Sequence, residues 1–318
     1  MITFVDVEEA RERIKDQIYL SPFPHSETIS RMTGNRVFFK LENLQMTGSF
    51  KERGALNRLL MLSPEEARRG VIAASAGNHG MAVAFHSRRL NIASTIVMPV
   101  SAPLIKVTRV RQYGATGVLC GNDYDSALAE ALRLSREKNL TFVSAFDDPW
   151  IVAGQGTIGL EIYEQNPDLQ AVIVPVGGGG LIAGIGLALK TLIPKIRIIG
   201  VQAEAVPSMK VALEKGAPAQ LPPATTIADG IAVRAVGATP FELAKSFVDE
   251  IVTVSEAEII EGMRIGAREV RLVLEPSGAV TLAALLHHRD ELPAGPVVVV
   301  ASGSNVDPAR YVEWLAEA

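Results

Sequence analysis

Short apolar runs alternate with longer amphipathic segments along most of the chain. Most of these runs are continuously apolar and do not alternate with polar residues, which is typical of parallel strands buried on both faces. We therefore predict a β-strand at each of nine runs: Arg36–Leu41, Val71–Ala74, Ser94–Pro99, Gly117–Cys120, Thr141–Ser144, Ala171–Val176, Arg197–Ala203, Glu250–Val254 and Pro296–Ala301.

Between the strands, apolar residues recur at helical spacing. Strands that alternate with helices in this way predict an α/β fold with parallel sheets. Nine strands exceed one small sheet, so we predict two α/β domains: a large one at residues 1–50 plus 148–318 and a small one at 51–147. The predicted helices are Lys51–Leu62, Asn78–Leu90, Pro103–Tyr113, Tyr124–Glu137, Trp150–Gln165, Leu181–Leu192, Ala257–Val273 and Ala279–His287, and Lys215–Thr226 is predicted as a loop.

The composition is that of an ordinary globular protein with a mild acidic excess. Of 318 residues, 48% are hydrophobic and 21% charged, and the formal net charge is −4. This charge argues against nucleic acid or an anionic membrane as the main partner, and no apolar run approaches the ~20 residues that span a bilayer. The single cysteine, Cys120, excludes an internal disulfide and fits a reducing compartment, so we expect a cytoplasmic protein.

A run of four glycines separates a predicted strand from a predicted helix. Gly177–Gly180 would let backbone N–H groups approach an anion closely, and the helix N-terminus after them adds partial positive charge. The pattern predicts a phosphate cradle, although a tight turn without a ligand would need the same residues. Gly178, Gly180 and Ala183 also match G-x-G-x-x-A, with Glu204 at the end of the next strand, so a nicotinamide-dependent dehydrogenase stays open as an alternative.

Three further segments carry candidate chemistry. Lys51 follows Gly48-Ser49-Phe50 and opens a predicted helix, and a desolvated lysine can act as a Schiff-base nucleophile or a base. Ser75-Ala76-Gly77-Asn78-His79 follows a short strand, and small polar groups at a helix N-terminus suit a carboxylate. Ser302-Gly303-Ser304-Asn305 follows a buried strand, at the edge where parallel sheets bind ligands.

In this order, the four segments resemble fold-type II pyridoxal-phosphate enzymes, and within them the threonine/serine dehydratase and serine racemase branch. The likeness also covers Lys40-Leu41-Glu42-Asn43, Ala153-Gly154-Gln155-Gly156-Thr157, Ile227-Ala228-Asp229-Gly230 and Glu275-Pro276-Ser277-Gly278, so it spans nearly the whole chain. It is strongest to the short, catabolic-type threonine dehydratases. It implies two parallel-sheet α/β domains of the tryptophan synthase β-like kind, and a homodimer or homotetramer.

The resemblance implies a role for each matched residue. Lys51 would hold pyridoxal 5'-phosphate covalently and take the α-proton of the substrate, and Ser302 would bond the pyridine nitrogen. The residues expected at the cofactor are Phe50, Lys51, Asn78, Gly177, Gly178, Gly179, Gly180, Leu181, Gly230 and Ser302. Those expected around the substrate carboxylate are Ser75, Asn78 and His79.

Some positions depart from the racemase pattern. Racemases carry a serine two residues before the motif's asparagine as a second acid/base, and this chain has Ala76 there. They also hold a divalent cation with two acidic side chains. Glu204 matches one of these, but Lys210 falls at the other, so the sequence leaves open whether a cation binds, with Glu204 as a possible ligand. The chain ends about 13 residues after Asn305, so feedback control through a C-terminal regulatory domain is not expected.

These observations predict a lyase of amino-acid catabolism. The expected reaction is the dehydration and deamination of L-threonine and/or L-serine to a 2-oxo acid and ammonia, and the expected partner is a small hydroxy amino acid. Serine racemase and 3-hydroxyaspartate dehydratase remain alternatives within the family. A catalytically dead binding protein of the same fold is a further alternative, against which the retained Lys51 and Ser302 argue.

Overall fold

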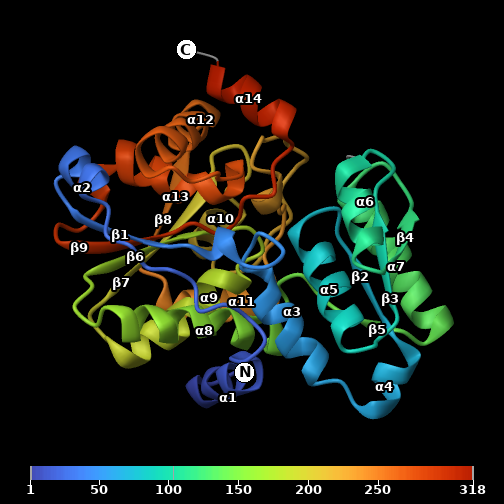
Figure 1. Cartoon of the computed structure of the whole chain (residues 1–318). Helices are drawn as coiled ribbons and strands as arrows, with labels where there is room; N and C mark the ends of the chain where they lie inside the picture. Colours follow the sequence, from blue (N-terminus) through green and yellow to red (C-terminus); the bar gives the residue numbers. More distant parts are fainter. Residues whose placement is uncertain (1, 103, 317–318) are drawn as a thin grey trace.

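The computed structural model describes residues 2–102 and 104–316. It contains two β-sheets, each made of parallel strands and covered by helices (Figure 1). The nine predicted strands are all present, and their observed ends differ from the predicted ones by at most two residues. They are β1 (Arg36–Lys40), β2 (Val71–Ala74), β3 (Ser94–Met98), β4 (Thr116–Leu119), β5 (Thr141–Phe142), β6 (Ala171–Pro175), β7 (Arg197–Ala203), β8 (Glu250–Val254) and β9 (Pro296–Val300).

The larger sheet has the strand order β1-β9-β6-β7-β8. Strand β6 pairs in parallel with β9 on one side and with β7 on the other. The carboxyl ends of β6 and β9 therefore lie next to each other, and the segments Gly177–Gly180 and Ser302–Asn305 follow them. In open α/β sheets this edge is where ligands bind.

Helices cover both faces of the larger sheet. Apolar residues of α8 (Pro149–Gln165) and α9 (Gly180–Leu192) form the core on one face. On the other face the core includes residues of α2 (Glu27–Thr33), α12 (Glu256–Ile265) and α13 (Pro276–His287). The remaining helices of this part are α1 (Phe4–Ile14), which packs on α8 and α9, and α10 (Ser208–Lys215), α11 (Ala238–Phe247) and α14 (Pro308–Ala316).

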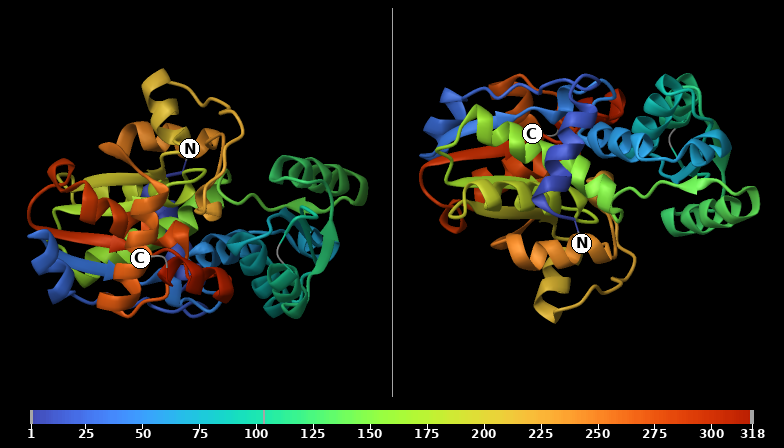
Figure 2. Two further views of the ribbon diagram at one scale, coloured as in Figure 1. Left: turned by 90° about the horizontal axis from the view of Figure 1, so that it is seen from above. Right: turned by 90° about the horizontal axis from the view of Figure 1, so that it is seen from below.

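The smaller sheet has the order β4-β3-β2-β5. One face packs against α3 (Lys51–Leu60), α5 (Asn78–Arg89) and α6 (Leu104–Gln112), and the other against α7 (Tyr124–Lys138). Figure 2 shows this sheet and its helices standing beside the larger layered part in both views. Its strands fall between residues 71 and 142, inside the range 51–147; the domain boundaries themselves stay a prediction.

Helix ends and short helices differ from the predictions. The predicted helix at Ala257–Val273 ends at Ile265, where a wider π turn (Gly266–Val270) and a left-handed Arg271 follow. The predicted first residue Pro103 lies outside the described residues. Six helices are absent from the sequence predictions: α1, α2, α4 (Pro64–Arg69), α10, α11 and α14. In the predicted loop only Lys215 is helical, and residues 216–226 form neither helix nor strand.

None of the helices within residues 2–102 and 104–316 is both long and apolar enough to cross a membrane.

Candidate active site

A cavity of about 260 Å³ lies between the parts of the molecule built on the two sheets. Segments of both sheets line it: the start of α3 and the loop after β2 on one side, and the loops after β6 and β9 on the other. Every residue predicted at the cofactor or the substrate lines it: Phe50, Lys51, Ser75, Asn78, His79, Gly177, Gly178, Gly179, Gly180, Leu181, Gly230 and Ser302. The possible metal ligand Glu204 does not.

Lys51 is brought into this cavity by two loops that pair edge to edge. The backbone N–H of Phe50 donates to the carbonyl of Ser302 (3.1 Å), and that of Ser304 donates to the carbonyl of Gly48 (2.9 Å). Because Lys51 is the first residue of α3, these bonds fix where the helix starts. They therefore fix Lys51 beside the loop that follows β9.

The amine of Lys51 is held in a weakly polar setting. Its Nζ donates to the carbonyl of Ala145 (2.8 Å) and lies 5.0 Å from the centre of the Phe50 ring. Burial lowers the pKa of Lys51 to about 8, although the negative charge of Glu275 opposes this shift. At pH 7 about a tenth of the amine is then neutral, far more than for an ordinary lysine, and a nucleophilic or basic lysine reacts in this form.

The glycine run forms a cradle that has no room for side chains. Gly179 has φ +95°, a left-handed conformation that favours glycine. A Cβ atom on Gly178 would lie 2.3 Å from Cγ of Phe146, and one on Gly177 would lie 3.1 Å from Cα of Ile231. The loop leads into the N-terminus of α9, where unpaired N–H groups favour an anion. Its shape and polarity fit a phosphate group.

Asn78 opens α5 and is bound on both sides of its amide. Its Nδ2 donates to Oε1 of Glu275 (2.6 Å), and its Oδ1 accepts from Nδ2 of Asn305 (2.8 Å). Ser75 precedes it, and the Ser75 Oγ accepts from the backbone N–H of Gly77 (3.1 Å). Asn78 thus reaches the cavity with a fixed amide.

His79 is buried, and its Nε2 lies 3.0 Å from the carbonyl of Val143. Burial lowers the pKa of His79 to about 3, and the charge of Lys51 adds to the effect. The ring is therefore neutral and donates from Nε2 to Val143. With so low a pKa the ring is a poor base, and its one N–H is already donated to Val143. Any contact of His79 with a substrate carboxylate would therefore come from its backbone N–H at the start of α5.

Glu275, for which the sequence predicts no role, also lines the cavity. It is 4% exposed. Burial and the nearby charge of Asp229 raise the pKa of Glu275 to about 7, against the opposing effects of Asn78 and Lys106. Its place in Glu275-Pro276-Ser277-Gly278 was the signal available in the sequence.

At the rim of the cavity, Lys106 and Asp229 form an ion pair of 2.6 Å between α6 and the loop that carries Gly230.

Glu204 lies apart from the cavity, just after β7, and is exposed. Its backbone N–H donates to the carbonyl of Val254 (2.9 Å). The part of the chain that the structure describes contains no group of three or more histidine, cysteine or acidic side chains placed to hold a metal ion. The possible metal-ligand role of Glu204 therefore gains no support from its surroundings.

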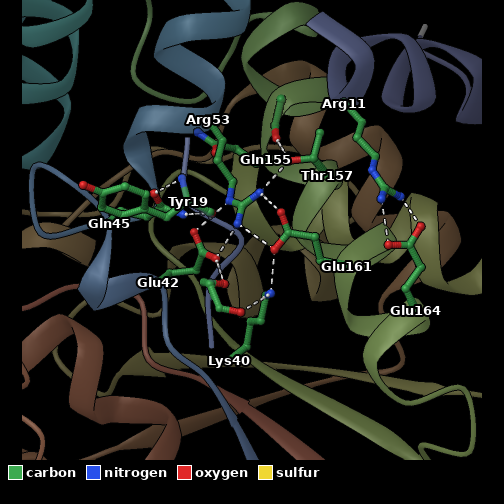
Figure 3. A network of polar contacts seen from close by, with 12 residues as sticks. Arg11, Tyr19, Lys40, Glu42, Gln45, Arg53, Gln155, Thr157, Glu161 and Glu164 are labelled. Atoms are coloured by element: carbon green, nitrogen blue, oxygen red, sulfur yellow. Dashed lines mark hydrogen bonds and ion pairs between the residues drawn. The ribbon is translucent and has the colours of Figure 1, made fainter. Parts of the chain in front are cut away.

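Behind α3 lies a buried cluster of charged side chains (Figure 3). Arg53 donates to both carboxylate oxygens of Glu42 (2.8 Å each) and to Glu161 (2.6 and 2.9 Å). Lys40 Nζ also donates to Glu161 (2.6 Å). Burial disfavours the charge on Arg53, but the carboxylates of Glu42 and Glu161 outweigh it and raise its pKa. The cluster links β1, α8 and the helix that begins with Lys51.

The chain matches the model of one protein family, described as pyridoxal-phosphate dependent enzyme, over residues 14–303. It is 46% identical to the L-threonine ammonia-lyase of Thermotoga maritima over 307 residues, which are 96% of this chain and 76% of that protein. It is 42% identical to the catabolic L-threonine dehydratase TdcB of Staphylococcus aureus over 314 residues, 98% of this chain and 91% of that one.

Solved structures show the same similarity. Maize serine racemase has a TM-score of 0.94 at 31% identity, and the match covers 98% of this chain and 96% of that one. The processed form of threonine deaminase isoform 2 from Solanum lycopersicum has a TM-score of 0.93 at 39% identity, with 99% and 92% covered. The proteins that this chain resembles therefore include a threonine ammonia-lyase, a threonine dehydratase, a threonine deaminase and a serine racemase.

Proposed function

The chain belongs to the family of pyridoxal-phosphate dependent enzymes, and we propose that it is an ammonia-lyase that converts L-threonine and/or L-serine to a 2-oxo acid and ammonia. The observation that carries the proposal is the convergence of Lys51, the glycine cradle Gly177–Gly180, Asn78 and Ser302 on one cavity. Relatives at 42% and 46% identity that are named for threonine deamination support the substrate class.

The lining residues fit the cofactor of this family. The cradle and the α9 N-terminus would hold its phosphate, and Phe50 and Gly230 would face its ring. Asn78 would donate a hydrogen bond to a polar substituent of the ring, and Ser302 would bond the ring nitrogen. When bound, pyridoxal phosphate delocalises the negative charge left at the substrate α-carbon.

Lys51 has two proposed roles, which its lowered pKa supports. As a neutral amine it would hold the cofactor covalently, and after release by the substrate amine it would take the α-proton. Ser302 is a neutral hydroxyl, which does not fully protonate a pyridine nitrogen; this limits charge storage in the ring and favours loss of the β-hydroxyl over transamination. Ser75 and the backbone N–H groups at the start of α5 would bind the substrate carboxylate.

Serine racemisation is the second candidate, because maize serine racemase shares the fold closely. A racemase needs an acid on the face of the substrate opposite Lys51. Ala76 lines the cavity at the position where the racemase pattern has a serine, and an alanine has no proton to give. This favours elimination. A nicotinamide-dependent dehydrogenase would leave Lys51, Asn78 and Ser302 without a use.

We also propose that the enzyme is cytoplasmic and homo-oligomeric. The single cysteine is compatible with a reducing compartment. Large apolar side chains remain exposed on the described chain, including Tyr19 (56%), Leu20 (66%) and Leu44 (49%), as expected of a surface that a second copy covers. Light scattering coupled to gel filtration measures the mass; a particle of 34 kDa would contradict the oligomer.

The direct test is 2-oxo acid formation from L-threonine, L-serine, their D-forms and 3-hydroxyaspartate by the cofactor-loaded enzyme. We expect turnover of L-threonine or L-serine that greatly exceeds turnover of the other compounds. Chiral chromatography of the remaining amino acid is run in parallel. If D-serine forms as fast as pyruvate, the enzyme is a racemase; if 3-hydroxyaspartate is the preferred substrate, the proposed substrate class is wrong.

A further inference from the structure

The amide of Asn78 is held from two directions. Its Oδ1 accepts from Asn305 Nδ2 (2.8 Å), and its Nδ2 donates to Glu275 Oε1 (2.6 Å). Turning the amide over would set donor against donor and acceptor against acceptor. The two neighbours therefore select one orientation, in which one N–H of Asn78 is engaged by Glu275 and the other is left for the cavity that Asn78 lines.

These bonds belong to a longer series with a fixed direction. Nη1 of Arg109 donates to Oδ1 of Asn305 (2.9 Å), and Asn305 Nδ2 also donates to the carbonyl of Thr47 (2.7 Å). A guanidinium only donates, and a carboxyl oxygen that carries no proton only accepts. The series Arg109–Asn305–Asn78–Glu275, which we call the amide chain, therefore has a donor at one end and an acceptor at the other, and neither asparagine can turn.

The amide chain crosses between the two sheets at each step. Arg109 lies on α6 and Asn78 on α5, which pack on the smaller sheet, whereas Asn305 follows β9 and Glu275 precedes α13. The carboxyl group is packed tightly, because a Cβ atom on Gly303 would lie 2.2 Å from Glu275 Oε1. The orientation of Asn78 thus depends on side chains that the larger sheet holds in place.

We propose that Glu275 and Asn305 are positioning residues that act through Asn78, by holding its amide so that the second N–H faces the bound cofactor. This inference deepens the proposed function and rests on contact between Asn78 and the cofactor. Neither Glu275 nor Asn305 needs to touch the substrate for this role.

The charged groups around Glu275 decide which substitution mimics it. Asp229 faces it from the loop that carries Gly230, Lys106 from α6 and Lys51 from α3. With a pKa of about 7, Glu275 carries a proton part of the time near neutrality. Protonation of one oxygen leaves the other free to accept from Asn78. Glu275→Gln preserves that acceptor without the charge, whereas Glu275→Leu removes it.

The test is a double-mutant cycle read out as the dissociation constant of pyridoxal phosphate, titrated into apoprotein and followed by absorbance and fluorescence. We expect Glu275→Leu to raise the dissociation constant about tenfold or more, because it leaves an N–H of Asn78 without its acceptor. Glu275→Gln should stay within about threefold of the unmodified protein. In an Asn78→Ala background, Glu275→Leu should cause little further change, because the two residues act as one unit.

Two results would overturn the inference: Glu275→Leu is as damaging without Asn78 as with it, or Glu275→Gln is as damaging as Glu275→Leu. Thermal unfolding of the apoproteins shows which variants fold. If Glu275→Leu does not, Asn305→Ala replaces it in the same cycle with the same expectation. Glu164→Gln, at an exposed ion pair with Arg11, is the control and should leave the dissociation constant unchanged.

The double-mutant cycle tests the positioning of Asn78, and the activity assay tests the proposed function, so either can be refuted without the other. If the unmodified enzyme forms 2-oxo acid and the cycle shows no coupling, the inference is wrong and the proposed function stands. If no hydroxy amino acid is turned over but the coupling is present, the proposed function is wrong and the positioning of Asn78 stands.

Discussion

The backbone N–H of Phe50 donates a hydrogen bond of 3.1 Å to the carbonyl of Ser302. The residue before Lys51 is thereby tied to the residue proposed to bond the cofactor ring nitrogen, although the two lie at opposite ends of the chain. This bond, together with the one from Ser304 to Gly48, therefore positions the Lys51 amine relative to the Ser302 hydroxyl. A substitution that shifts the start of α3 should therefore also shift the loop after β9, and the reverse.

Lys51→Ala should abolish covalent attachment of the cofactor and lower 2-oxo acid formation by about 10²–10⁴-fold or more, because both the amine that binds the cofactor and the proposed base are lost. Mass spectrometry after borohydride reduction detects the attached cofactor, and the visible absorption band reports it directly. The exposed Lys195 provides the control: Lys195→Ala should leave both unchanged. Full activity of the Lys51 variant would refute the assignment.

Gly178→Ala should weaken cofactor binding about tenfold or more, because the added methyl group lies 2.3 Å from the Phe146 ring and either the ring or the cradle must move. Titration of apoprotein with pyridoxal phosphate measures the effect. Gly216→Ala is the control. An alanine at the φ of +75° found there should lower stability by about 1 kcal/mol, but nothing lies within 4 Å of the new atom. Equal losses of affinity in both variants would show that the cradle is not specific.

Arg53→Met should lower the free energy of unfolding by about 3–5 kcal/mol, because it leaves the buried carboxylates of Glu42 and Glu161 without their main partner. Arg11→Met breaks the partly exposed pair with Glu164 that Figure 3 shows beside the cluster, and should cost less than about 1 kcal/mol. Urea unfolding of the two apoproteins compares them. Similar midpoints would mean that the buried cluster contributes little.

Glu275→Gln should change how stability depends on pH. Its carboxyl has a pKa of about 7 in the folded protein against an ordinary value of 4.5, so the folded state binds more protons between these pH values. Stability of the unmodified apoprotein therefore falls as the pH rises from 4.5 to 7, by at most about 3 kcal/mol from this group. Glu275→Gln has no carboxyl group at this position, so this loss of stability between pH 4.5 and 7 should not occur in the variant. Parallel pH curves of the two proteins, from urea unfolding, would contradict a raised pKa.

Ala76→Ser should introduce racemisation of L-serine while 2-oxo acid formation stays at the same order of magnitude. The new hydroxyl supplies an acid on the face opposite Lys51, and a positioned proton donor contributes about 10²–10⁴-fold to such a step. Chiral chromatography of the amino acid pool, run with a 2-oxo acid assay, measures both products. The unmodified enzyme is the reference, and rapid D-serine formation by it would show that Ala76 does not decide the outcome.

The strands and the cofactor-binding loops could be predicted from the sequence because their signals are local. Largely apolar runs such as Arg197–Ala203 are best accounted for by a strand covered on both faces, and β7 has these same bounds. The run Gly177–Gly180 likewise indicates a place where the backbone can approach a ligand closely. Helix α1 was predictable too: Val7, Ala10 and Ile14 are its buried residues and recur at helical spacing, but the charged residues between them hid the pattern.

The tertiary structure alone decided which charged residues are buried and what they do. Arg53, Glu42 and Glu161 look like surface residues in the sequence, since the burial of a charge depends on partners that the fold brings from distant segments. The same holds for Glu275, whose partner Asn78 lies on a helix of the other sheet. A candidate base such as His79 becomes a neutral donor to Val143 for the same reason. Local pattern determined the fold and the cofactor loops, whereas long-range contacts set the protonation and orientation of the side chains within the site.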